Sequence, residues 1–494
     1  MLRKLAGETA IYGMSHVLPR ILNYVVLTVY LTYKFDNTRD FGIYSDLYAY
    51  ATIILTLMVF RMDTAYFRYG SRESNLNKVF STAFIPLAIA TLMMVMLMYQ
   101  YAESIANFLK YPGKQYYVKW FAGILSFDAI CALVYARFRL ESRPMRFLFY
   151  RVANVLLTIV FILIFLELIP QISPNFYLKI GRLSGVNSQL DWVFFSNLLA
   201  SFMVFILMLP EFRKVKFEFD KSLYIQMLKY SIPLVIVGIA GNINQAMAVP
   251  LQKYLLKGNT EFNLSMAGIY SAAAKLAILI NLFTTAYNYA AEPFFFNTAA
   301  KNEKSDVYGD MAYAFTLFTG LAALFTYFYI DVLILLIGPQ YRSGVTVVPI
   351  LLVSYIFLGI YYNVSIWYKL ADKTYIGGLI SVAAVMVTLL SSFLLLPTIG
   401  IMGSAITSLL CYGFMAAAGY LTGQKYHPIS YPVKAMGRII VIVVVFMTLS
   451  WSVRNYIPQP LHMQIAMQSL LGLLALLTVY KYEFSSMASL LRKK

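Results

Sequence analysis

The sequence predicts an all-α polytopic membrane protein with about 14 transmembrane helices. Its composition, the spacing of its apolar runs and the distribution of its cations point to this class. Of the 494 residues, 60% are hydrophobic and only 13% are charged. Soluble proteins carry about 25% charged residues, so this chain lacks the polar surface that water would require. A helix crosses the hydrocarbon core with about 20 mostly apolar residues, and the chain has runs of this length throughout.

Apolar runs separated by short polar or turn segments locate the spans. The loop at about 169–190 is the longest on its side and is too short for a soluble domain. The function is therefore expected inside the membrane. We expect spans at 9–33, 41–60, 79–99, 117–136, 147–168, 190–210, 228–250, 267–292, 311–336, 345–368, 374–396, 399–421, 435–453 and 463–480.

The cations predict the orientation. When cations in the first turn of a span are counted with the adjoining segment, 26 of the 40 Lys and Arg residues lie on the same side as the N-terminus, 11 lie on the opposite side and three (Arg20, Arg151 and Lys275) lie deeper within spans. Short cytoplasmic loops carry such an excess, so both termini are expected to be cytoplasmic. Because the cations of this +18 chain sit in short loops, we expect no nucleic-acid partner. The two cysteines and three histidines share no metal-ligand spacing, so we expect no metal and no cofactor.

A short internal repeat supports two related halves. Residues 41–45 are FGIYS and residues 267–271 are AGIYS, 226 positions further on. Six spans separate the copies, so both have the same orientation. Parallel repeats of this kind are found in transporters that bind substrate between their halves.

Polar and charged residues interrupt the first span. Arg20 lies about a dozen residues from either end, and an arginine at such a depth costs about 2.5–3.5 kcal/mol on insertion scales. We expect it to face a wet cavity or a partner, with Pro19 bending the helix. The alternative is a packing kink with the Arg20 side chain extended to the surface.

Further charges lie in spans 2, 4 and 5. Arg61, Asp63 and Arg68 mark the inner end of span 2, where Arg61 and Asp63 either pair in a solvated network or contribute to a cavity. Asp128, near the middle of span 4, is a candidate proton or ion site or a partner for Arg20 or Arg151, and we favour the partner role. Arg151 is close enough to the inner end of span 5 to reach the surface.

Spans 7 and 8 combine flexible and charged positions. Pro233, Gly238 and Gly241 make span 7 a candidate hinge. Lys275 lies two turns inside span 8. Glu292, directly before a proline, marks the expected inner exit of that span.

A wet cavity with Arg20, Arg61, Arg68 and Lys275 would attract an anion, and arginine suits phosphate through paired hydrogen bonds. The chain has no phosphate-binding glycine loop followed by Lys and Ser or Thr. Energy would therefore come from the substrate gradient or from H⁺ or Na⁺.

Several segments resemble the O-antigen and capsule polysaccharide flippases of the multidrug/oligosaccharidyl-lipid/polysaccharide (MOP) superfamily. The resemblance spans essentially the whole chain. The segments are Leu18–Arg20 (LPR), Gly42–Tyr44 (GIY), Asp63–Arg68 (DTAYFR), Arg139–Pro144 (RLESRP), Tyr230–Leu234 (YSIPL), Gly268–Ser271 (GIYS) and Ala291–Phe296 (AEPFFF).

The resemblance implies two six-helix lobes in a pseudo-two-fold V arrangement plus two C-terminal helices. The lobes would be residues 1–215 and 216–425, with the last two spans and a cytoplasmic tail at 426–494. It also implies a non-enzyme that turns a polyprenyl-diphosphate-linked oligosaccharide from the inner to the outer face of the bacterial cytoplasmic (inner) membrane by alternating access.

Similar lipid II flippases use arginines of spans 1, 2 and 8, which here correspond to Arg20, Arg61 or Arg68, and Lys275. Two features depart from the pattern. Position 275 is lysine, and residues 249–253 (VPLQK) lack the acidic-basic pair that many relatives have near the end of span 7.

Three other functions remain open. The chain could be an ion-coupled exporter of drugs or metabolites from the same superfamily, although a basic cavity disfavours cationic drugs. A membrane polysaccharide polymerase or ligase would be expected to have a larger outer loop than 169–190. A scaffold without transport would have no use for intramembrane charge.

Overall fold

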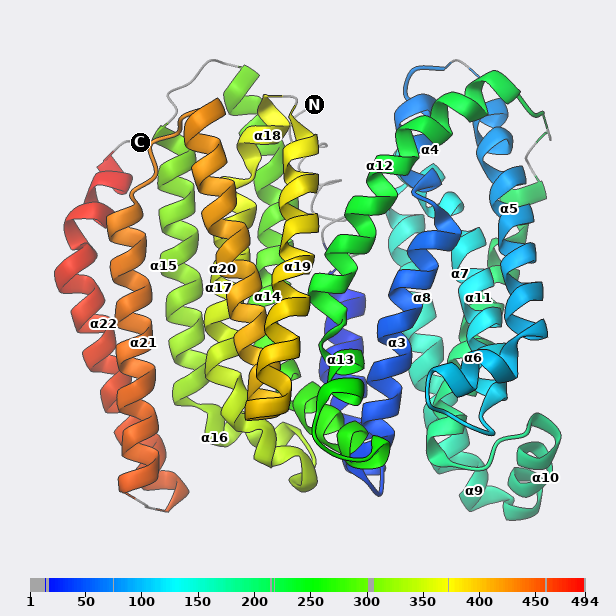
Figure 1. Ribbon diagram of the computed structural model, residues 1–494, viewed down its shortest axis with the longest axis horizontal. Helices are drawn as coiled ribbons and strands as arrows, with labels where there is room; N and C mark the ends of the chain where they lie inside the picture. The colour runs from blue at the N-terminus through cyan, green and yellow to red at the C-terminus, as the bar shows by residue number, and fades with distance from the viewer. Residues whose placement is uncertain are drawn as a thin grey trace. The chain divides into compact units, whose positions relative to one another are not determined.

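The computed structural model is helical throughout the residues it describes, which are 14, 17–73, 75–213, 216, 218–300, 306–371, 373–457 and 460–492 (Figure 1). Thirteen helices in these ranges are long and apolar enough to cross a membrane. The predicted all-α polytopic class is thus confirmed. The first predicted span, 9–33, begins outside the described residues, and only its part from residue 17 onward is described without gaps.

Backbone contacts divide the chain into two compact units. The first contains the described residues up to Leu27 together with Ile43–Pro250. Its helices, apart from α3, which the boundary divides, are the π-helix η1 (Leu22–Leu27), α4 (Met62–Gly70), α5 (Leu76–Gln100), α6 (Ala102–Phe108), α7 (Gln115–Leu140), α8 (Pro144–Leu163), the π-helix η2 (Ile164–Leu168), α9 (Ile169–Ile172), α10 (Pro174–Ser184), α11 (Gln189–Arg213) and α12 (Lys221–Ala246).

The second unit contains Thr28–Gly42 and the chain from Leu251 onward. The boundaries cross α3 (Thr38–Val59) and α13 (Ala248–Leu255). The other helices are α2 (Thr28–Lys34), α14 (Thr260–Ala300), α15 (Asp306–Phe328), α16 (Ile330–Leu333), the 3₁₀ helices η3 (Ile334–Leu336) and η4 (Pro339–Val347), α17 (Val348–Val364), α18 (Ile366–Leu370), α19 (Thr374–Ile399), α20 (Ile401–Tyr426), α21 (Val433–Tyr456) and α22 (Leu461–Arg492).

The unit boundaries differ from the expected lobe boundary at 215/216. Helix α12, which was expected to open the second lobe, packs on α4 and α5 of the first unit. Conversely, Thr28–Gly42 from the first half of the chain belongs to the second unit. The chain passes from the first unit to the second after Leu27 and again after Pro250. These two points are at nearly equivalent positions of the predicted repeat. The division into lobes stays a prediction, because packing and repeat symmetry need not divide the chain at the same residue.

Hydrogen bonds attach α2 and the following turn to the second unit. The Thr32 hydroxyl accepts from the Gly338 N–H at 3.2 Å, and the Tyr33 hydroxyl donates to the Leu335 carbonyl at 2.6 Å. The Gln340 amide donates to the Phe35 carbonyl at 2.8 Å. These bonds satisfy backbone groups in the segments between helices. The hydrocarbon core of a membrane has no water that could do so.

The start of α12 is held by an exposed polar contact. Asp220 accepts from the Leu223 N–H, as a helix N-cap does, and pairs with Lys78 of α5 at 2.8 Å. The hydrogen bond from the Lys78 ammonium lowers the pKa of the Asp220 carboxyl from its ordinary value. The ion pair and the cap direct α12 onto the first unit.

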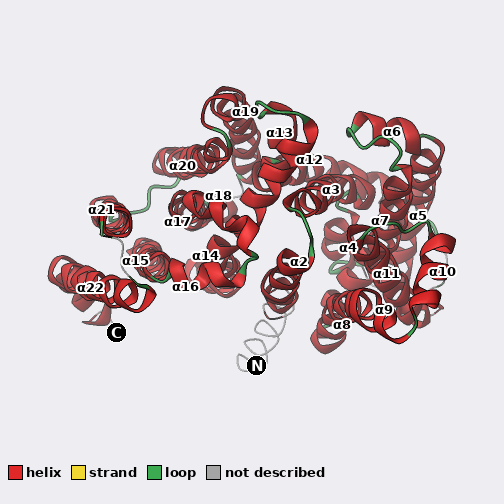
Figure 2. Cartoon of the chain, turned by 90° about the horizontal axis from the view of Figure 1, so that it is seen from below, coloured by secondary structure: helices red, strands yellow, loops and turns green. Residues whose placement is uncertain are grey.

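Helix α21 packs mainly on α15, and α22 packs on both α21 and α15 (Figure 2). Arg454 of α21 pairs with Asp331 at 2.8 Å and donates to the carbonyls of Tyr327 and Phe328, at the end of α15. At the other end of α21, Arg438 pairs with the fully buried Glu483 of α22. Polar contacts at both ends therefore fix α21 against its neighbours.

The repeat glycines meet at the crossing of α3 and α14. A Cβ at Gly42 would overlap the carbonyl oxygen of Leu264, and a Cβ at Gly268 would overlap that of Thr38 and lie 2.9 Å from the Gly42 nitrogen. Only glycine permits so close an approach of two backbones. The two copies of the GIYS repeat thus contact each other directly.

Helix α14 continues beyond its span. The apolar span ends at Asn288, close to the exit expected at Glu292–Pro293, but the helix itself continues through the proline to Ala300. A proline inside a helix removes one hydrogen bond, and neighbouring contacts can offset that loss. Phe295 is buried and its ring lies 5.4 Å from that of Tyr308 in α15, which supports the continued helix.

We predict that Gly268→Ala lowers the stability of the purified protein. The added methyl must displace the backbone of α3, and overpacking of this kind costs about 1–3 kcal/mol. Gly437→Ala is the matched control, because its Cβ would meet nothing within 4 Å and alanine favours helix. Thermal unfolding in detergent measures both. Equal unfolding temperatures for the two variants would contradict the proposed close crossing.

Candidate functional site: intramembrane cations

Arg20 lies in a helical stretch that changes form one residue later. Residues 17–21 are α-helical, and the π-helix η1 follows at Leu22–Leu27. The Arg20 side chain is exposed in the first unit. A π-helix widens the turn and marks a bend or a functional site in many proteins. The expected interruption near Pro19 is therefore present as a change of helix type.

Arg61 stands at a backbone break in the second span. Phe60 and Arg61 both have positive φ, 52° and 54°, a conformation that costs non-glycine residues about 1–3 kcal/mol each. The break ends α3 at Val59 and starts α4 at Met62, with the Arg61 carbonyl accepting from the Thr64 and Ala65 N–H groups. The side chain of Arg61 thereby leaves the direction that a continuous helix would give it.

Helix α12 covers this break. The Ser231 hydroxyl donates to the Arg61 carbonyl at 3.5 Å, and the Asn242 amide donates to the Thr52 carbonyl at 3.0 Å and to the Thr56 hydroxyl at 2.8 Å. Between these contacts, an ideal Cβ on Gly238 would lie 2.6 Å from an Nη atom of Arg61. The guanidinium therefore lies directly on the bare backbone of α12.

The Arg61 guanidinium is left without a polar partner. Its Nε is enclosed and makes no hydrogen bond, and among the described residues its side chain forms no ion pair. An Oδ1 of Asp63 is likewise buried without a partner. The expected alternative of an Arg61–Asp63 pair is therefore not formed within the described part of the chain. Arg61 is only partly exposed.

Arg68 has a different environment. It is exposed, and its guanidinium carbon lies 4.2 Å from the centre of the Tyr230 ring. Such stacking attracts the cation to the ring face. Of the two arginines expected at the end of span 2, Arg61 has the enclosed position and Arg68 has an aromatic partner.

Asp128 and Arg151 lie near each other in the first unit without forming a salt bridge. Asp128 accepts from the Ser201 hydroxyl at 3.1 Å, and no ion pair of Asp128 is found among the described residues. Arg151 is exposed and stacks over the ring of Tyr135 at 4.3 Å. Its charge still attracts the Asp128 carboxylate, so the role of Arg151 as a charge partner of Asp128 stays a prediction.

The remaining candidates are distributed over both units. Lys275 is half-buried on α14 in the second unit, and the side chain of Glu292 lies outside the described part. Pro233 sits inside α12, which continues to Ala246. An added Cβ on Gly241 would meet nothing within 4 Å.

A network at the ends of α7, α8 and α11 holds charges that the sequence analysis counted only as loop cations. Glu141 pairs with Arg137 at 2.7 Å and with Arg143 at 3.0 Å, and the nearly buried Glu211 pairs with Arg146 at 2.7 Å. The spacing of Arg137 and Glu141, four residues apart on one helix, could have indicated the first pair. These arginines are structural rather than candidate ligands.

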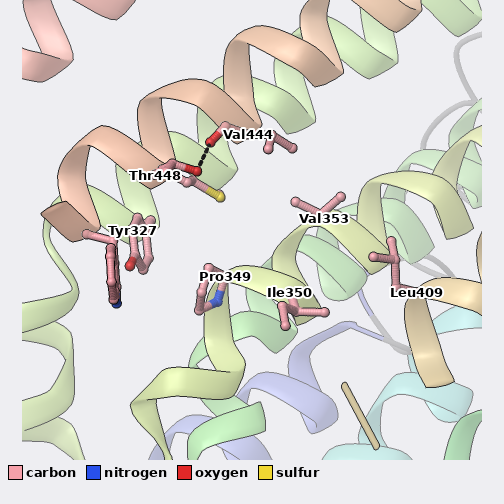
Figure 3. Close-up of a pocket in the computed structure, with 9 residues that line it drawn as sticks. Tyr327, Pro349, Ile350, Val353, Leu409, Val444 and Thr448 are labelled. Carbon is pink, nitrogen blue, oxygen red and sulfur yellow. Dashed lines mark hydrogen bonds between the residues drawn. The ribbon is translucent and has the colours of Figure 1, made fainter. Parts of the chain in front are cut away.

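The second unit contains an apolar cavity of about 310 Å³ between α15, α17, α20 and α21 (Figure 3). The only hydroxyls among its lining residues are those of Tyr327 and Thr448, and the Thr448 hydroxyl donates to the Val444 carbonyl at 2.9 Å. The lining therefore suits hydrocarbon rather than a charged group. It consists of Tyr327, Pro349, Ile350, Val353, Leu409, Val444, Met447, Thr448 and Trp451.

No group of three or more His, Cys, Asp and Glu side chains within the described ranges could hold a metal ion. The chemistry that the described site offers is therefore that of guanidinium groups. They bind anions by charge and by paired hydrogen bonds.

The fold is similar to the folds of several solved multi-pass membrane transporters and flippases. The chain is similar to the structure of the lipid II flippase MurJ in an inward closed conformation, with a TM-score of 0.73 and 13% identity over 96% of this chain and 99% of that one. It is also similar to an inward-facing multidrug resistance MATE family transporter of the MOP superfamily, with a TM-score of 0.63 and 12% identity over 87% and 99% of the two chains.

A third similar structure is the bent form of the Vibrio cholerae MATE transporter VcmN, with a TM-score of 0.57 and 12% identity over 88% of this chain and 98% of that one. No protein-family model matches the sequence, and no curated protein sequence matches it either. At these identities the likeness is one of fold.

We predict that Ser201→Ala destabilises the protein through Asp128. Removing the hydroxyl leaves a carboxylate inside a span without its donor, which costs about 1–3 kcal/mol. In an Asp128→Ala background the same serine change should have little effect. Thermal unfolding of the four proteins of this cycle measures the coupling, and additive effects would show that the hydrogen bond contributes nothing.

Proposed function

We propose that the protein is a flippase that moves a polyprenyl-diphosphate-linked oligosaccharide, such as an O-antigen, capsule or exopolysaccharide repeat unit, across the bacterial cytoplasmic membrane from its inner to its outer face. A sugar headgroup cannot cross hydrocarbon unaided, whereas the prenyl chain can stay in lipid. The protein needs only to supply counter-charges for the diphosphate and to open to each side in turn.

The observation that carries the proposal is the Arg61 guanidinium. It is held at a strained break, it rests on a helix backbone, and it has no partner among the described residues. A partly enclosed cation without a counter-charge is unfavourable unless a ligand supplies one. A diphosphate can do so through charge-assisted hydrogen bonds. We infer that Arg20 and Lys275 serve the same ligand, with Arg68 as a further candidate contact.

The likeness to a lipid II flippase over nearly the whole of both chains supports this substrate class. The cation distribution supports cytoplasmic termini. We infer alternating access between two lobes, with Pro19, Pro233, Gly238 and Gly241 as candidate hinge positions. The ligand can drive the change only by binding one conformation more tightly than the other.

We predict that Arg20→Ala and Arg61→Ala each abolish or strongly reduce the export of lipid-linked sugar while leaving the amount of membrane-inserted protein unchanged. Each hydrogen bond to a charged group contributes about 1.5–3 kcal/mol, so binding of a polyprenyl diphosphate should weaken at least about tenfold. The affinity of Arg61→Lys should lie between those of the unchanged protein and Arg61→Ala, since lysine keeps the charge but cannot form the paired hydrogen bonds.

Surface polysaccharide in cells and polyprenyl-diphosphate binding in detergent measure these effects. Binding of an organic cation by the same variants serves as the control. Normal surface polysaccharide in cells carrying Arg20→Ala would contradict the assignment of the site.

The second candidate is an ion-coupled exporter of drugs or metabolites, and Asp128 is the observation that favours it. A carboxylate inside a span that has one hydrogen bond, from Ser201, and no salt bridge among the described residues is available to bind H⁺ or Na⁺. The likeness to MATE transporters is compatible with this role.

We predict that Asp128→Asn leaves transport by the proposed flippase nearly unchanged when only a substrate gradient drives it, and removes any dependence on an imposed H⁺ or Na⁺ gradient. Uptake into proteoliposomes with and without each gradient measures this. If Asp128→Asn instead abolished uptake of an organic cation, and no lipid diphosphate bound, the exporter function would be favoured.

A further inference from the structure

We propose that Gly238 is a positioning residue for Arg61: the absence of a Cβ forms a seat on α12 that holds the guanidinium in the orientation in which it meets the diphosphate. This inference rests on the proposed flippase function. It names the element that prepares the binding arginine before the ligand arrives.

The geometry defines the seat closely. An ideal Cβ on Gly238 would lie 2.6 Å from one Nη of Arg61, 2.9 Å from Nε and 3.1 Å from the guanidinium carbon. The whole plane of the group, and not only its tip, thus rests on the glycine. Any other residue at position 238 would have to move the guanidinium away.

The contacts on either side keep α12 in register with the break. Ser231 lies two turns before Gly238 and bonds to the Arg61 carbonyl, and Asn242 lies one turn after it and bonds to α3. Residues at these spacings share one face of a helix. Ser231 and Asn242 therefore hold α12 against the second span on either side of Gly238, and Gly238 lies opposite the guanidinium of Arg61.

The seat explains why a cation without a partner can hold one orientation. A free arginine side chain samples many rotamers, and fixing it upon binding would oppose affinity. Here the positive-φ backbone at Phe60 and Arg61 sets the direction of the side chain and Gly238 sets its distance from α12. Nε is enclosed, while the residue as a whole stays partly exposed toward a ligand.

The test compares Gly238→Ala, Arg61→Ala and the double variant with the unchanged full-length protein in detergent. The probe is farnesyl diphosphate, and both its affinity and thermal unfolding are measured. We expect Gly238→Ala to lower the affinity at least about tenfold, Arg61→Ala to lower it as much, and the double variant to bind like Arg61→Ala alone. The unfolding temperature of Gly238→Ala should not fall, because the overlapped atoms belong to the end of a flexible side chain that can move away and alanine favours helix.

Two further glycine variants isolate the seat. Gly437→Ala, on α21, measures the general effect of a methyl in open space, and its affinity should not change. Gly241→Ala removes the same backbone freedom from α12 three residues further on without meeting any atom within 4 Å. An equal loss of affinity in Gly241→Ala would show that flexibility of α12, and not the seat, is responsible.

The remaining outcomes separate this inference from the proposed function. If Arg61→Ala weakens farnesyl diphosphate binding and Gly238→Ala does not, the seat is overturned and the flippase function stands. If neither variant changes the affinity, Arg61 does not hold the diphosphate, and the proposed site is overturned. A loss of stability in Gly238→Ala that Arg61→Ala fails to relieve would assign the glycine to helix packing alone.

Discussion

Hydrocarbon offers no hydrogen-bond partner, so every interruption of a helix in this protein must be covered by another part of the chain. The break at Phe60–Arg61 is covered by Ser231 and Asn242 of α12. The carbonyls at the end of α15 are satisfied by Arg454, from a helix far along the chain. In both places, irregular backbone occurs together with a side-chain partner from a neighbouring helix.

The same constraint accounts for the use of glycine. Gly42 and Gly268 allow the backbones of α3 and α14 to touch, and Gly238 allows a guanidinium to lie on α12. In both places, the absence of a side chain creates the contact. The repeat therefore has a physical meaning in the fold: its two glycines form one crossing, and a side chain added to either copy would meet the backbone of the other helix.

The membrane class and most spans could be predicted because a run of about 20 apolar residues has few other uses. The contact of Arg61 with α12 could not, because the bonded residues Ser231 and Arg61 are 170 positions apart. The break itself has no sequence signal, since neither Phe60 nor Arg61 is a residue that favours positive φ. At Glu292–Pro293 the local rule for proline locates the exit of the span, which ends at Asn288, but not the end of the helix, which continues to Ala300 with Phe295 packed on Tyr308.

Arginines of the first unit differ in whether they have a carboxylate partner, and the sequence indicates this only for Arg137 and Glu141, four residues apart on one helix. Arg137, Arg143 and Arg146 have carboxylate partners, so most of their charge is already compensated within the fold. Arg61 has none among the described residues. A compensated arginine gains little from a phosphate, because the new bond replaces an existing one, whereas an uncompensated and partly enclosed arginine gains the full interaction. The lack of a carboxylate partner among the described residues, more than depth in the membrane, is therefore the reason to propose Arg61 rather than these three arginines as a ligand.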